Sequence, residues 1–394
     1  MSVIELSTST RTVDPRLAEL YRRQAEHPFW NSELLIGFDR GAFSKEDLQY
    51  IFSQYHLYSK NFTRFVAAVM ANCEDDLFRA QLSENLWDEG GGCEPERRHA
   101  QIFRNFLSRG LNVDPATIQY APYTHNFVRE FLVACLRAEP MAGAAFLSLG
   151  TEGIVPRLYQ LMVKGLRTAG VGEADLEFFR IHISCDDAHA ETLENMMLSY
   201  CTQPGWFEAC SAALDHALTL RAEFFASIFS ALQTRRFAPI AARVQARRSL
   251  ADGLAEAALH YRPGGDTKPL YANKVDKLNI EFTVERVPFD AEVLDPRMVR
   301  IPPGKFNEKH KHAHETLIHI LEGAGQVVLD DRTLHVQPGD TVLVPRWAMH
   351  QTQNLGATEM RFLAVTDFNL TQRAFLGDAT DYRMQPDADA KRRN

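Results

Sequence analysis

The sequence lacks any uninterrupted run of about 18 apolar residues, the length that a membrane-spanning helix needs. Its first 20 residues also lack the basic segment followed by an apolar segment that marks a secretory signal. We therefore expect a cytoplasmic protein without membrane association.

The sequence also lacks an excess of positive charge and a recognisable cysteine motif. The chain has 43 Lys and Arg against 51 Asp and Glu, for a net charge of -8, so electrostatic attraction to nucleic acid is not expected. Basic runs such as 243–248 are short and are typical of solvated faces. The six cysteines all lie in the first 210 residues at spacings that fit neither a zinc motif nor a disulfide framework, so we expect reduced thiols.

The chain of 394 residues, with 45% hydrophobic content, is long enough for two domains. Residues 1–240 keep a helical period, interrupted by proline and glycine, which predicts a compact all-α bundle. The expected helices cover about 15–26, 44–73, 75–88, 95–110, 126–137, 141–168, 178–193 and 204–235, the sixth of them bent at Pro156.

The composition and periodicity of the sequence change after the predicted bundle. Residues 241–270 are rich in Ala, Arg, Gly and Pro, which indicates a linker. Residues 271–380 alternate Val, Ile, Thr and Phe with polar residues between Gly, Pro and Asp turns, which predicts a β-sandwich or barrel. A polar tail, 381–394, follows, so the predicted fold class is a multidomain α + β protein.

One stretch of the bundle, 178–193, combines an apolar helical pattern with His182, Asp186 and His189. Steps of four and three residues place these side chains on one helix face. Two imidazoles and a carboxylate on a buried face need a neutralising partner, and a metal ion is the simplest one.

Three further polar residues lie where core is expected, namely Glu89, His99 and Glu152. Carboxylates and imidazoles from separate helices suit a non-haem di-iron site. Taken singly, each is more often half-exposed or paired, as Glu152 would be with Arg157. Asp88 and Glu96 are alternative acids nearby.

The segments NLWDEGG, TEG and HISCDDAH, in that order with His99 after the first, resemble the heme-oxygenase-like di-iron oxidase and oxygenase family. The resemblance covers about 15–235. It implies two Fe(II) ions, O2 as co-substrate, and Asp88 and Glu96 as non-ligands. The ligands that it implies are Glu89, His99, Glu152, His182, Asp186 and His189.

Family members that oxygenate nitrogen have an additional carboxylate ligand on the helix that precedes the first Glu ligand. This sequence lacks that carboxylate. Here Asp47 and Glu74 bracket a helix without any acid, and Asn61 or Thr63 stands near the corresponding position. The departure favours oxidative cleavage, desaturation or decarboxylation over N-oxygenation.

The segment PPGKFNEKHKHAHETLIHILEGAG resembles the first motif of cupins, and 345–354 resembles the second. Thr316 occupies the Glu position of the first motif and Trp347 the Gly position of the second. The residues that fall in register are Gly304, His310, His312, Gly323, Pro345, His350 and Asn354.

The surviving imidazoles, His310, His312 and His350, imply a third iron with open positions for substrate and O2. His314 and Glu315 could substitute as ligands. The alternative is a cupin that is only structural, because a fold does not imply a function.

The domain order resembles the two-domain metalloenzymes that form the N-nitrosourea of streptozotocin. The leading hypothesis is a non-haem iron oxygenase of specialised metabolism, with di-iron oxidation in the bundle and a second step in the cupin. We expect a small substrate derived from an amino acid, and Arg157 and Arg64 are candidates for binding its carboxylate. We also expect a homodimer and possible use of an external electron donor. The alternatives are oxidative C-C or C-N cleavage with a non-catalytic cupin, and a non-catalytic metal-binding or effector-binding protein.

Overall fold

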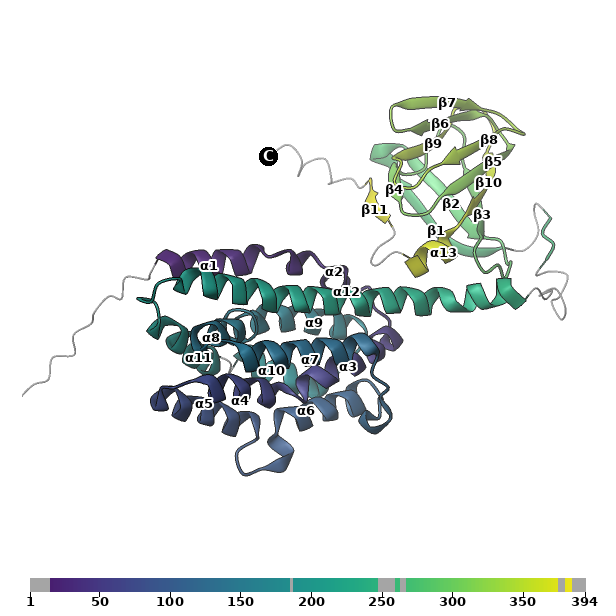
Figure 1. Ribbon diagram of the computed structural model, residues 1–394. Coiled ribbons are helices and arrows are strands. Elements are labelled where there is room, and N and C mark those ends of the chain that lie inside the picture. The colour runs from purple at the N-terminus through teal and green to yellow at the C-terminus, as the bar shows by residue number, and fades with distance from the viewer. Residues whose placement is uncertain (1–14, 185–186, 247–258, 263–266, 375–379, 385–394) are drawn as a thin grey trace, which may run out of the picture. The chain divides into compact units, whose positions relative to one another are not determined.

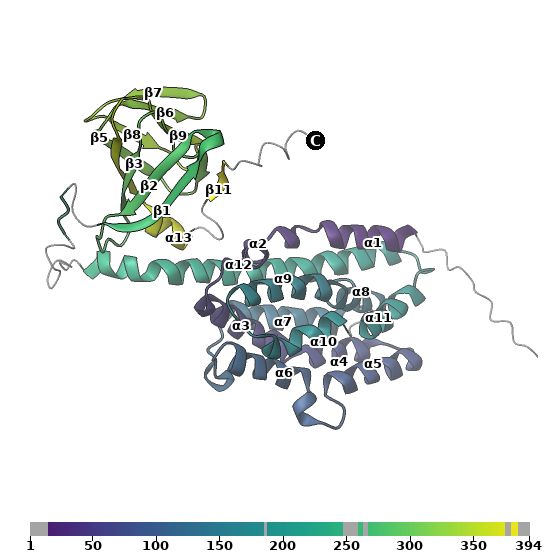
Figure 2. The same ribbon diagram turned by 180° about the vertical axis from the view of Figure 1, so that it is seen from behind.

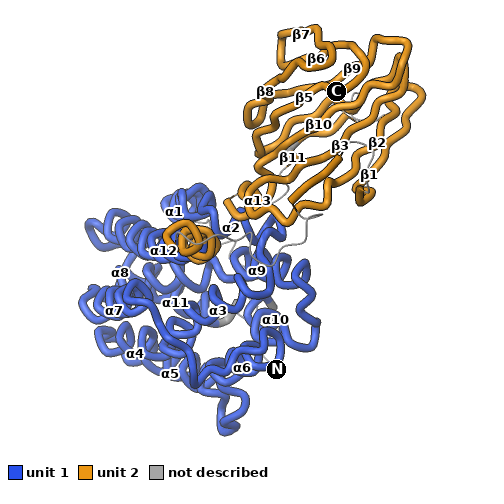
Figure 3. The backbone as a smooth tube through the Cα atoms, turned by 90° about the vertical axis from the view of Figure 1, so that its right-hand side faces the viewer, with its two compact units in different colours: residues 1–232 blue, residues 233–394 orange. Residues whose placement is uncertain are grey.

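The computed structural model describes residues 15–184, 187–246, 259–262, 267–374 and 380–384. The chain divides into two compact units, residues 1–232 and 233–394, coloured separately in Figure 3. Helices build the first unit, and two β-sheets form most of the second (Figure 1). The predicted fold class, an all-α bundle followed by a β-domain, is therefore confirmed.

The helical unit is built from consecutive helices with short connections, visible from both sides in Figures 1 and 2. Their bounds are α1 Pro15–Glu26, α2 Glu33–Asp39, α3 Lys45–Ser59, α4 Phe62–Asn72, α5 Asp76–Glu89, α6 His99–Asn105, α7 Pro122–Arg137, α8 Pro140–Ser148, α9 Val155–Thr168, α10 Glu177–Ser184, α11 Asp187–Ser199 and α12 Trp206–Ala246. Short turns of 3-10 or π-helix lie between them at Pro28–Asn31, Pro95–Arg97, Phe106–Gly110, Pro115–Thr117, Glu152–Ile154 and Glu173–Asp175.

Local chemistry explains where several helices begin and end. Ser44 and Asp47 form the expected capping box at the start of α3, each side chain accepting from the other's backbone N–H. The single helix predicted for 44–73 is divided into α3 and α4. At the break, Asn61 donates to the carbonyl of Leu57 at 2.6 Å, a side-chain bond that competes with the helix ladder.

The helix predicted for 141–168 is also divided. α8 ends at Ser148, and α9 begins at Val155 with Pro156 in its first turn, where proline is tolerated. The interruption thus precedes Pro156 and contains Glu152, which lies on a turn of 3-10 helix. The helix α2 was not among the predicted elements.

The long helix α12 continues past the predicted end near Arg235 and through Pro239 to Ala246. Residues 241–246 of the predicted linker are consequently helical. Residues 247–258 and 263–266, which were also assigned to the linker, lie outside the described residues.

Aromatic side chains fill much of the core of the helical unit. Phe52 of α3 has edge-to-face contacts with Phe106 at 5.1 Å and with Phe179 of α10 at 5.6 Å. Phe127 of α7 stacks on Phe224 of α12, with ring centroids 4.3 Å apart. These contacts join α3 to α10, which carries His182, and α7 to α12.

The second unit is a sandwich of two sheets with strand orders β1-β2-β3-β10-β5-β8 and β11-β4-β9-β6-β7. The strands are β1 Lys268–Val275, β2 Ile280–Arg286, β3 Asp295–Ile301, β4 His310–His312, β5 Thr316–Glu322, β6 Gly325–Leu329, β7 Arg332–Val336, β8 Thr341–Val344, β9 His350–Asn354, β10 Met360–Thr366 and β11 Thr380–Arg383, and a helix α13 spans Phe368–Ala374. The pairs are antiparallel, and the apolar positions of the alternating pattern form one core, with residues such as Ile280, Ile320 and Met360 fully buried. In the second sheet, His310 of β4 is paired directly with His350 of β9.

Candidate metal centres

Three polar side chains of the helical unit converge from separate helices. Glu89 is the last residue of α5, His99 is the first residue of α6, and His182 lies in α10. A tight turn, 90–92, reverses the chain between the first two. Gly91 has a φ of 79°, and a Cβ there would lie 2.4 Å from the backbone nitrogen of Arg98, so this turn requires glycine.

The donor atoms of these three residues lie within 4.8 Å of one another. His99 Nδ1 is 3.0 Å from Glu89 Oε1 and 3.1 Å from His182 Nε2. The other ring nitrogen of His182, Nδ1, donates to the carbonyl of Phe178 at 2.6 Å. That bond leaves the lone pair of Nε2 directed at the cluster, which is how metal-binding histidines are usually oriented.

Burial and mutual charge set the protonation of the cluster. Burial opposes ionisation of Glu89, but the hydrogen bond from His99 and the nearby imidazoles outweigh it, so the pKa of the Glu89 carboxyl lies below its usual value. Burial lowers the pKa of His182 to about 4, against the opposing charge of Glu89. A carboxylate and a neutral imidazole are the forms that bind a metal ion.

The cluster faces a cavity that Glu152 also lines. Glu152 is only 4% exposed, as the apolar surroundings in the sequence indicated. His189 of α11 is buried too, with Nδ1 4.0 Å from Glu89 Oε1 and Nε2 3.5 Å from the exposed Asp88. The structure thus brings Glu89, His99 and His182 together, with Glu152 and His189 close by.

Asp186 lies outside the described residues, so its predicted role remains a prediction. His182 lies in α10 and His189 in α11, and residues 185–186 between these helices lie outside the described residues, so the single helix predicted for 178–193 stays a prediction. Glu96, the alternative acid, is exposed and does not line the cavity.

The two arginines proposed for the substrate carboxylate lie elsewhere. Arg157 is exposed, stacks over Trp30 at 3.9 Å and donates to the carbonyl of Ala25. Arg64 is exposed and lines a different pocket together with Asn61. Neither lines the cavity that contains Glu89.

The cavity has other polar residues that the sequence analysis did not single out. Tyr55, Tyr58 and Tyr159 line it, each at most 4% exposed, and so does the buried Arg221 of α12. Arg221 could have been found, because it interrupts the buried apolar stripe of α12, which consists of Leu214, Ala217, Leu218, Phe224, Phe225 and Ile228.

The side of the cavity formed by α3 and α4 contains no acid among the described residues. Tyr55, Tyr58, Ser59 and Phe62 line it there, whereas Asn61 points to the other pocket. The sequence indicated that this part of the chain supplies no carboxylate. Hydroxyl and aromatic side chains line the cavity there instead.

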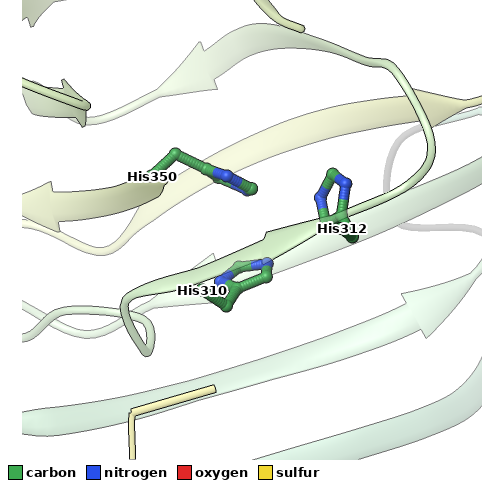
Figure 4. A group of neighbouring side chains, drawn as sticks. All are labelled: His310, His312 and His350. Carbon is green, nitrogen blue, oxygen red and sulfur yellow. The ribbon is translucent and has the colours of Figure 1, made fainter. Parts of the chain in front are cut away.

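The β-domain holds a second cluster, formed by His310 and His312 of β4 and His350 of β9. Figure 4 shows the three imidazoles directed toward one another, and one ring nitrogen of each lies within 4.8 Å of the others. His310 and His312 share a strand face because their positions differ by two, and His350 is opposite His310 on the neighbouring strand.

A backbone carbonyl fixes the tautomer of each imidazole. Nδ1 of His310, His312 and His350 lies 2.8, 2.8 and 3.0 Å from the carbonyl oxygens of Glu308, His314 and Ala348. With the proton on Nδ1, every Nε2 presents a lone pair. Burial lowers the pKa of all three, to about 2 for His312, so the rings are neutral.

The departures from the cupin motifs have clear structural positions. Thr316, at the Glu position, is buried in β5. Trp347, at the Gly position, has a φ of 62°, the left-handed conformation that the family's glycine would adopt more easily. Its N–H donates to the carbonyl of His312, which ties this turn to the histidine strand. Of the possible substitutes, His314 stacks on His312 at 3.5 Å, whereas Glu315 is exposed.

Both donor sets fit iron. A mixed set of carboxylate oxygen and imidazole nitrogen suits a non-haem iron pair, and three neutral imidazoles suit a single ion with open positions. In both clusters a backbone acceptor orients at least one imidazole for coordination.

Comparison with known families places each unit in a class. Residues 49–222 match the model of a family of iron-containing redox enzymes, and residues 297–366 match the cupin domain model. The chain therefore carries a haem-oxygenase-like iron redox enzyme domain followed by a cupin domain, and it is an enzyme.

Individual relatives are distant. The chain is 28% identical over 161 residues to a 4-aminobenzoate synthase of Chlamydia pneumoniae, a match that covers 40% of this chain and 70% of the relative. A 4-aminobenzoate synthase of Chlamydia trachomatis is 27% identical over 175 residues, covering 43% and 71%. Among solved structures, a cupin 2 domain-containing protein from Halorhodospira halophila shares 30% identity over 26% of this chain and 66% of that one, with a TM-score of 0.21.

None of the helices in the described ranges combines the length and apolar character needed to cross a membrane.

Proposed function

We propose that this enzyme is a non-haem iron oxygenase or oxidase that uses O2 to oxidise a small organic acid in the cavity of the helical unit. The convergence of Glu89, His99 and His182 in a buried cavity carries the proposal. Glu152, Asp186 and His189 complete the proposed ligand set for two Fe(II) ions. Bound Fe(II) supplies the electrons for O2 reduction, a chemistry that amino-acid side chains do not provide.

The residues around the cluster support this role. Phe62, Leu158 and Phe178 provide apolar walls that exclude water, which strengthens the electrostatic interactions inside. The hydroxyls of Tyr55 and Tyr159 are 3.3 Å apart in the same cavity, and burial raises the pKa of Tyr55, so its hydroxyl keeps its proton. These side chains can donate hydrogen bonds to a polar substrate group.

The relatives named 4-aminobenzoate synthases form an aromatic acid, which supports chemistry on an aromatic compound that carries a carboxylate. The aromatic lining of the cavity is compatible with a ring. The lack of an acid from α3 and α4 in the described lining supports oxidative cleavage over N-oxygenation. In the proposed reaction sequence, the oxidation in the helical unit comes before the step in the cupin.

The cupin is proposed to hold a third Fe(II) and to process or rearrange the product. The support is the set of three neutral imidazoles with oriented Nε2 lone pairs. The second candidate function keeps all chemistry in the helical unit. Thr316 favours it, because the cupin lacks the carboxylate ligand that its motif normally supplies.

Oxygen uptake by the anaerobically Fe(II)-loaded enzyme tests the helical site, with amino acids and aromatic acids as candidate substrates. His182→Gln is expected to lower uptake at least about a hundredfold, since loss of an outer partner alone costs about 10- to 100-fold. The exposed Glu96→Gln is the matched control and should retain wild-type uptake. Unchanged uptake in His182→Gln would contradict the proposal.

Mass spectrometry of the products then separates the two candidate functions. If the cupin is catalytic, His350→Ala accumulates the product of the first oxidation while O2 is still consumed in the helical unit. If the final product is the same as in the wild type, the cupin has no catalytic part.

A further inference from the structure

Arg221 is a fully buried cation on the core face of α12. It is 2% exposed, and its neighbours on that face, Leu218, Phe224 and Phe225, are buried as well. A charged guanidinium in such surroundings is costly unless an anion or a full set of hydrogen bonds compensates for the lost hydration. The partners of Arg221 therefore decide what it does.

Those partners are neutral. Nε donates to the carbonyl of Gly150 at 3.1 Å and Nη2 donates to the hydroxyl of Tyr58, while the cation lies over the rings of Tyr58 and Phe131 at 4.7 and 5.1 Å. Burial raises the pKa of Tyr58, so its hydroxyl is not an anion. In the described part of the chain, no carboxylate lies within ion-pair distance of Arg221.

The same cavity contains Arg221 and the cluster of Glu89, His99 and His182. The remaining lining is largely aromatic or aliphatic, including Phe62, Leu158 and Tyr159. The cavity thus offers a metal cluster, an apolar wall and a buried cation. The hydroxyl of Tyr55, which also lines the cavity, is a third neutral hydrogen-bond partner of the guanidinium.

We propose that Arg221 binds the carboxylate of the substrate and so selects a small acid with an aromatic or apolar body. This inference rests on the proposed function of the helical unit. A guanidinium pairs with carboxylates more strongly than with neutral groups, and the pairing fixes orientation. With the carboxylate at Arg221, the rest of the molecule extends toward the proposed ligands.

The neighbouring groups hold the guanidinium in place for this role. Gly150 lies so close to α12 that a Cβ would be 2.3 Å from the Cβ of Ala217. The carbonyl of Gly150 can therefore approach Arg221 from the backbone of the segment that leads into Glu152. Arg221 is thereby oriented before a ligand binds, which lowers the entropic cost of binding.

Equilibrium dialysis of the full-length protein with 4-aminobenzoate tests the inference, because this probe joins a carboxylate to a ring. The neutral 4-aminobenzamide has nearly the same shape. Wild-type protein is expected to bind the acid about tenfold or more tightly than the amide, the preference expected of a charge-assisted hydrogen-bond pair. Arg221→Met should remove this preference, and Arg221→Lys should retain part of it.

Binding is measured with Fe(II) under anaerobic conditions and again without metal, because a carboxylate can also bind iron directly. A preference that persists without metal supports Arg221. A preference that is equal in the wild type and Arg221→Met, or the lack of any preference in the wild type, overturns the inference. Arg157→Met, which removes an exposed arginine outside the cavity, should bind like the wild type.

Two controls keep the result interpretable. Circular dichroism and thermal melting show whether Arg221→Met folds, and if it does not, the comparison of acid with amide in wild type and Arg221→Lys decides. Elemental analysis reports iron in each protein. Iron binding without a carboxylate preference contradicts only this inference, whereas a carboxylate preference without iron in the helical unit contradicts only the proposed function.

Discussion

His310, His312 and His350 are held in the tautomer that presents Nε2, because a backbone carbonyl lies beside each Nδ1. The site is therefore oriented by the fold and needs little rearrangement to bind a metal ion. His182 has the same arrangement through the carbonyl of Phe178. Because backbone carbonyls orient imidazoles in the same way at both clusters, we infer that both bind metal.

The acid sensitivity of the metal-free β-domain follows from its neutral histidines. Burial lowers the pKa values of His310 and His350, and those of His312 and His314 to about 2 and 3. In the unfolded chain these groups bind protons near pH 6.5, so the unfolded state binds more protons below that pH. Stability is therefore lost as pH falls below about 6.5, by about 1.4 kcal/mol per pH unit for each histidine that stays neutral.

Hydrogen exchange of β4 and β9 in the metal-free protein, measured from pH 7 to pH 5 and corrected for intrinsic exchange, checks this expectation. Protection should fall steeply below about pH 6.5. His314→Phe, which removes one of the four groups, should show a shallower dependence. Protection that does not depend on pH would mean that the histidines are not buried and neutral.

Residue types that cannot be buried without a partner could be predicted from the sequence. Glu89, Glu152 and His182 stand out within apolar patterns, and all three are buried. Arg221 was not predicted, although it breaks an equally clear pattern, because a long arginine is often able to extend to solvent. Only packing shows that it does not.

At the scale of elements, the turn between α5 and α6 brings Glu89 and His99 together. Gly91 adopts a left-handed conformation against the backbone of Arg98. Gly91→Ala is expected to destabilise this turn by about 1 to 3 kcal/mol and to weaken iron binding about tenfold. Competition with an Fe(II) chelator measures the affinity, and urea unfolding measures the stability.

Gly172→Ala is the matched control, because the nearest atom to its added Cβ is 3.7 Å away and its φ is an ordinary -72°. It should leave both quantities near the wild-type values. Equal iron affinity in Gly91→Ala and wild type would show that this turn does not position the cluster.

Element boundaries depended on details that sequence periodicity does not contain. The pattern predicted the helices around Ser44 and Pro15, which have strong start signals, and both are confirmed. The break at Asn61 and the end of α12 depend on side-chain bonding and on packing beyond the helix itself. For this reason most helices lie where they were predicted, but several of their first and last residues differ from the prediction.

At the scale of the whole molecule, two clusters of candidate metal ligands occur in the two compact units of one chain. Helix spacing indicated His182 and His189, whereas His99 and the three cupin histidines were expected from the resemblance to family motifs. The substrate could not be predicted, since the cavity is lined by α3, α5, α9 and α12 residues that lie far apart in the sequence. A sequence pattern relates positions that are close along the chain, whereas the residues that line the cavity come from distant positions.

We propose that each chain binds iron at two sites, one in each unit. Anaerobic titration with Fe(II), followed by elemental analysis after desalting, measures it directly. We predict about three irons per chain for the wild type, about one for Glu89→Gln and about two for His350→Ala, given a pair in the helical unit and a single ion in the cupin. A wild-type content of one iron that Glu89→Gln leaves unchanged would contradict the account.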